Sequence, residues 1–76
     1  MLNKEFTYYK DNQDYFVNLY NGKIIVLQGT EVLGVYDTQI DAYLETVKNY
    51  ELGTFLIQQV APGEESYTIK LHSRGF

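Results

Sequence analysis

The sequence predicts one small α+β domain, with a mostly antiparallel sheet and its helices packed on one face. Three observations lead to this fold class. Apolar residues recur at helical spacing between residues 3 and 20, a β-branched run is followed by a glycine turn and a second apolar run, and a capped amphipathic helix precedes two further strands. The expected order of elements is α(α)ββαββ over residues 1–76, with 1–12 loosely ordered and 73–76 as a tail.

The N-terminal segment favours helix but is interrupted by a polar cluster at residues 11–14. We expect a short helical turn near residues 6–9 and a better helix from Gln13 to Tyr20. Asn12 is a candidate N-cap, because its side chain can accept hydrogen bonds from the free N–H groups of a first helical turn. Asn21-Gly22 is expected to end this helix, since glycine adopts the left-handed conformation without steric penalty.

The next segment predicts a β-hairpin over residues 23–36. Its first strand contains the apolar run Ile24–Leu27, which indicates either cover on both faces or one packed face and one face in an interface. Gly29-Thr30 is the expected turn. Gly34, within the second strand, predicts a bulge or the close approach of another element.

A second helix is expected after Asp37, with Thr38 as its N-cap and Asp41 three residues later, as in a capping box. Its predicted buried stripe is formed by apolar residues at i, i+3, i+4 and i+7: Ile40, Tyr43, Leu44 and Val47. Glu45 is placed to pair weakly with Lys48. Gly53 is the expected end of this helix.

Two more strands are predicted, at residues 54–60 and 66–72, with a polar loop at 61–65 between them. The last strand alternates apolar and polar residues, which is typical of one buried and one hydrated face. These two strands are expected to pair as a hairpin.

Composition excludes several functional classes. The chain has no cysteine and one histidine, His72, so no disulfide, metal site or cofactor is expected. A net charge of −4 with scattered basic residues argues against a nucleic-acid partner. No apolar run could span a membrane and no signal peptide is recognisable, so the expected location is the cytoplasm. A core this small favours dense aromatic packing or oligomerisation.

The carboxylates do not predict an enzyme. Asp37 and Asp41 flank a predicted helix start, where negative charge is favourable, and Glu64 and Glu65 lie in a predicted solvated loop. General acid–base catalysis instead requires convergent titratable groups in a pocket. We therefore expect no catalytic residues.

Four residues are candidates for binding. His72 and Arg74 could hold an anionic small ligand, because arginine binds carboxylate or phosphate with two hydrogen bonds; the alternative is a strand end with both side chains in water. Tyr8 and Tyr9 belong to an excess of tyrosines, which are enriched at protein interfaces. The alternative for the tyrosines is amphipathic packing at the edge of a small core.

Glycine and apolar scaffold positions recur along much of the chain: Tyr20–Leu27, Val32–Thr38, Ala42-Tyr43 and Gly53–Gln58. This pattern resembles a small bacterial domain of unknown function, which occurs in short free-standing proteins and beside retroviral-like aspartic protease domains. The resemblance implies the same small scaffold and assigns no catalytic residue.

The expected function is a non-catalytic protein-interaction or self-associating module, with a protein partner or a second copy of the chain. The alternative is a small-ligand sensor or regulatory subunit with its site near His72 and Arg74. Analytical ultracentrifugation tests the first class, and a thermal-shift screen of metabolites with Arg74→Ala tests the second.

Overall fold

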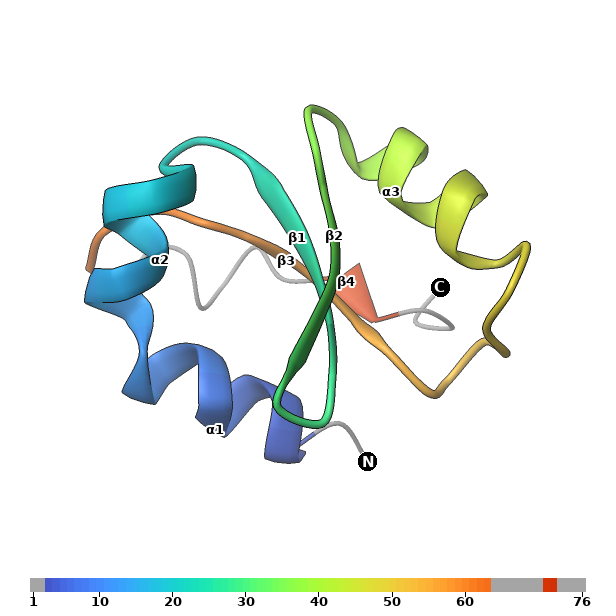
Figure 1. Ribbon diagram of the computed structural model, residues 1–76, viewed down its shortest axis with the longest axis horizontal. Helices are drawn as coiled ribbons and strands as arrows, with labels where there is room; N and C mark the ends of the chain where they lie inside the picture. The colour runs from blue at the N-terminus through green and yellow to red at the C-terminus, as the bar shows by residue number, and fades with distance from the viewer. Residues whose placement is uncertain (1–2, 64–70, 73–76) are drawn as a thin grey trace.

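The computed structural model describes residues 3–63 and 71–72, and it confirms the α+β fold class (Figure 1). The helices and strands follow one another in this order: α1 (Asn3–Asp11), α2 (Gln13–Tyr20), β1 (Ile24–Gln28), β2 (Glu31–Tyr36), α3 (Gln39–Thr46), β3 (Leu56–Gln59) and β4 (Leu71–His72).

The strands form one antiparallel sheet in the order β2-β1-β3-β4. β1 is central, because it pairs with β2 on one side and with β3 on the other. The predicted pairing of the last two strands is confirmed, with Leu56 opposite His72 and Ile57 opposite Leu71. β3 is shorter than the predicted strand 54–60, and the rest of the predicted last strand lies outside the described residues.

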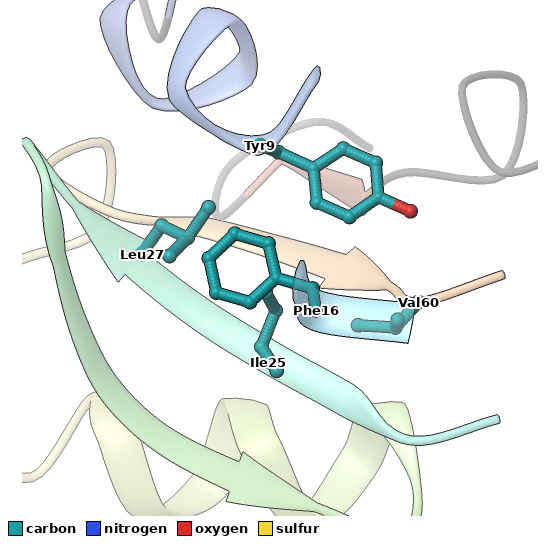
Figure 2. Packing of buried hydrophobic residues seen from close by; sticks show 5 residues of the cluster. All are labelled: Tyr9, Phe16, Ile25, Leu27 and Val60. Carbon is teal, nitrogen blue, oxygen red and sulfur yellow. The ribbon is translucent and has the colours of Figure 1, made fainter. Parts of the chain in front are cut away.

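The helices lie on both faces of the sheet, so the expectation that they share one face is wrong. Ile25 and Leu27 point toward α1 and α2, and Figure 2 shows them packed with Tyr9 and Phe16. Ile24 and Val26 point the other way and pack in a second cluster with Ala42 of α3. Successive strand residues alternate between faces, so a run of buried apolar residues needs cover on each side.

α1 is longer than the short turn predicted near residues 6–9. It is anchored at both ends. Glu5, nearly buried, accepts a hydrogen bond from the Gly29 N–H in the β1–β2 turn (2.7 Å). The Tyr9 hydroxyl donates to the Ala61 carbonyl (3.2 Å) after β3. α1 therefore connects two loops that are distant in the sequence.

Asn12 does not cap α2 as predicted. Its side-chain amide donates to the Tyr8 carbonyl (2.9 Å), and its backbone N–H bonds to the carbonyls of Tyr8 and Tyr9. The chain passes directly from α1 into α2, so the Asn12 side chain completes the end of the first helix instead of the start of the second. The predicted end of α2 is confirmed, with Gly22 at φ +86°.

The bulge predicted at Gly34 is present in β2. Val26 lies opposite Gly34 and Leu27 lies opposite Val32, which leaves Leu33 as the extra residue. A Cβ atom at Gly34 would lie 2.6 Å from the Tyr36 hydroxyl oxygen, because the Tyr36 ring lies across the glycine. A side chain at this position would therefore force the Tyr36 ring to move.

α3 begins as predicted, with the Thr38 Oγ1 accepting from the Asp41 N–H (3.0 Å). Its buried face matches the predicted stripe only in part, because Tyr43 and Val47 pack partly buried against the second cluster. Ala42 and Thr46 are buried against the sheet, whereas Ile40 and Leu44 are exposed. Ala42 packs on the sheet, and Ile40 and Leu44 lie on the outward side of the helix. The helix ends at Thr46, before the residues expected to close it.

Candidate functional site

The two tyrosines predicted as binding residues contribute to the core. Tyr9 is fully buried, and its ring stacks on Phe16 with centroids 5.9 Å apart. Tyr8 is half-buried and meets the edge of the same Phe16 ring at 5.8 Å. For these two residues, amphipathic packing describes the structure, and Tyr9 is not accessible to a partner.

The second predicted pair is only partly described. His72 lies in β4, where its backbone pairs opposite Leu56, on the edge of the sheet far from β2. The His72 side chain and Arg74 lie outside the described residues, so the structure does not test the expected anion site.

Among the described residues, four of the seven exposed large apolar side chains form two similar pairs on helices; the other three are Val35, Tyr50 and Leu52. On α2 they are Tyr15 and Leu19, 59% and 52% exposed. On α3 they are Ile40 and Leu44, 65% and 52% exposed. Each pair has i, i+4 spacing and so lies on one side of its helix. We call Ile40 and Leu44 the α3 face.

The α3 face was missed because its residues fit a helical stripe that looked like core. The signal against it lay in Ala42 and Thr46, a small pair at i, i+4 spacing that is suited to close contact with a sheet. Ile and Leu are more hydrophobic than Ala and Thr, so hydrophobicity alone assigned Ile40 and Leu44, and not Ala42 and Thr46, to the buried side of the helix.

Beside the α3 face is an open hollow of about 350 Å³ at the edge of the sheet. We call it the edge hollow. Its lining comes from the residue before β1, from β2, from the turn between β2 and α3, and from α3: Lys23, Val35, Tyr36, Asp37, Asp41 and Glu45. A second open hollow, of about 450 Å³, lies at the C-terminal end of α3 and is lined in part by Tyr43, Tyr50 and Leu52.

The charges of the edge hollow are partly compensated. Lys23 forms an ion pair with Asp37. Glu45 pairs with Lys48 (3.1 Å), which confirms the predicted weak pair. Asp41, between the two, makes no ion pair with another described residue. One exposed carboxylate of this region thus has no ion pair among the described residues, although the start of α3 favours its negative charge.

Among residues 3–63 and 71–72, no group of three or more His, Cys, Asp or Glu side chains is arranged to hold a metal ion. In that same part of the chain, no helix combines the length and the apolar character needed to cross a bilayer.

Fold and surface together define a small α+β domain with an apolar helix face beside an acidic hollow. No family model, curated protein or solved structure matches the chain. The resemblance to the small bacterial domain therefore stays a prediction.

Proposed function

We propose that this protein is a non-catalytic protein-interaction module whose contact surface is the α3 face. The observation that carries the proposal is the outward position of Ile40 and Leu44 on a helix whose other side is packed on the sheet. Fully burying a side chain of this size contributes about 1.5–3 kcal/mol. Two adjacent residues therefore supply a useful apolar centre for an interface.

The α3 face is a better candidate than the similar pair on α2 because of its surroundings. It adjoins the edge hollow, and the hollow is bordered by Val35 on β2, an end strand of the described sheet. End strands present unpaired backbone groups that can bond to another chain. Apolar side chains, a hollow and a strand edge thus meet in one region, and each of them is a feature that protein recognition uses.

Self-association is the form of the proposal to test first, since it needs no identified partner. Sedimentation velocity over a wide range of concentrations is expected to show a dimer. If the chain sediments as a monomer, the assay becomes peptide binding. A displayed library of random peptides is then selected against the 76-residue chain, and we expect it to yield binders.

The chain offers matched variants for both assays. In Ile40→Ser/Leu44→Ser we expect loss of the dimer or of peptide binding, with the folded state retained, because both residues are exposed. In Tyr15→Ser/Leu19→Ser, which changes an equally spaced and similarly exposed pair, we expect the dimer or the peptide binding to be retained. A monomer that selects no peptide, or a loss confined to the α2 variant, would contradict the proposal.

A bacterial, cytoplasmic setting is also proposed. It is supported by the family resemblance and by the acidic, cysteine-free composition.

A further inference from the structure

The α3 face is bordered on one side by negative charge. Three carboxylates recur every four residues, at Asp37, Asp41 and Glu45, and all three line the edge hollow. Asp41 and Glu45 lie one turn apart on α3, where like charges are mutually unfavourable, and Asp37 stands just before the helix, ahead of the extended N-cap Thr38. A cation brought between them would relieve this repulsion.

Among the described residues, two of the three carboxylates form ion pairs with lysines, and the one between them, Asp41, does not. Lys23 forms an ion pair with Asp37, and Lys48 forms one with Glu45. Asp41 has no ion pair within the described part of the chain. The Asp41 backbone is fixed at the helix start, because its N–H donates to the Thr38 Oγ1, and its side chain is exposed. A partner cation entering the hollow therefore meets one exposed carboxylate that has no ion pair within the described residues.

The remaining lining of the hollow favours a planar cation. Tyr36 lines the hollow, although its ring also lies against Gly34 and packs partly buried on the core cluster beneath α3, and Val35 adds apolar surface. Guanidinium groups stack on aromatic rings and bind carboxylates with two parallel hydrogen bonds, whereas the ammonium of lysine is a compact, strongly hydrated charge. The hollow suits arginine better than lysine.

We propose that the α3 face and the edge hollow together bind a partner segment in which an arginine lies beside an apolar residue. The apolar residue covers Ile40 and Leu44, and the arginine enters the hollow to pair with Asp41. This inference rests on the proposed function and adds the chemistry of the partner. The occupant follows from charge complementarity, because the surface combines an apolar centre with an acidic border.

NMR titration of the ¹⁵N-labelled chain tests the inference with defined probes. They are the tripeptide acetyl-Leu-Arg-Leu-amide and its counterpart acetyl-Leu-citrulline-Leu-amide, whose neutral side chain has nearly the shape of arginine. We expect the arginine peptide to bind about tenfold more tightly, which corresponds to one charge-assisted contact. Amide shifts are expected at residues 35–45, and added salt should weaken only the arginine peptide.

Matched variants separate this site from general attraction to an acidic protein. Asp41→Asn is expected to abolish the preference for arginine over citrulline. Asp14→Asn removes the same charge from the first turn of α2 and should leave the preference unchanged. Both substitutions are at exposed positions, so the folded state should be retained.

Equal affinity for the two peptides, shifts outside residues 35–45, or the same loss in Asp14→Asn would overturn the inference. So would the absence of any shift with the arginine peptide. None of these outcomes bears on the loss of association expected in Ile40→Ser/Leu44→Ser, so the two proposals can fail separately.

Discussion

At the scale of single residues, Glu5 shows how an acidic side chain of a helix becomes part of the fold. Its carboxylate is nearly buried and accepts from the Gly29 N–H, in a turn where Gly29 has φ +63°. The bond satisfies a backbone donor that the β1–β2 turn leaves free. It also fixes α1 against the hairpin, which no local sequence signal predicts.

We predict that Glu5→Ala lowers the free energy of unfolding by about 1–3 kcal/mol, because the Gly29 N–H loses a charged acceptor in a largely buried position. Glu5→Gln should lose less, since its amide oxygen can still accept. Chemical denaturation measures the loss, and hydrogen exchange at Gly29 should become faster in Glu5→Ala. Equal losses in the two variants would contradict the role of the bond.

At the scale of elements, local signals worked where the hydrogen bond is made within a few residues. Thr38 caps α3 as predicted, and Gly34 marks the bulge in β2. Asn12 failed as a cap because two helices compete for the same residue, and the end of α1 takes its side chain. Capping rules consider one helix end at a time, so they do not say which of two adjacent helix ends a side chain will bond to.

The cap of α3 gives a prediction at this scale. Thr38→Ala should reduce the free energy of unfolding by about 1 kcal/mol, since the Asp41 N–H loses its acceptor. Thr38→Ser keeps the hydroxyl oxygen and should stay close to the unchanged protein. Thermal or denaturant unfolding distinguishes the variants. A serine variant as unstable as the alanine variant would show that the Thr38 methyl group, and not the cap, stabilises the helix.

At the scale of the whole molecule, the sheet is a layer between two sets of helices. Tyr9 and Phe16 cover one face and α3 covers the other, so β1 is enclosed on both sides (Figures 1 and 2). Two small cores replace the single core expected with all helices on one face.

One substitution made at three positions tests this arrangement. Ile24→Val and Ile25→Val should each lower the free energy of unfolding by about 0.5–1.5 kcal/mol, because these neighbours are buried on opposite faces of β1. Ile40→Val, on the exposed side of α3, should change it by less than about 0.5 kcal/mol. Denaturation at low protein concentration compares the three. A negligible effect at either Ile24 or Ile25 would mean that one face of the sheet is uncovered.

The candidate surface was less predictable than the fold. Ile40 and Leu44 were assigned to the core because the sequence shows which helix residues are apolar but not which side of the helix meets the sheet. That side is chosen by fit, and Ala42 permits a closer approach than a larger side chain would. Tyr9 was expected at the surface for the related reason that its hydroxyl needs a partner, which is the Ala61 carbonyl 52 positions away along the chain.

The sequence by itself determined the α+β class, the order of the elements, the hairpin with its bulge, and the cap of α3. These features depend on backbone preferences and hydrogen bonds between residues close in the chain. Only the tertiary structure decided that the helices divide between two faces, that Tyr9 is buried, and that Ile40 and Leu44 are left outside beside the acidic hollow. Those outcomes depend on how surfaces from distant segments pack, and packing is a property of shape that no local pattern contains.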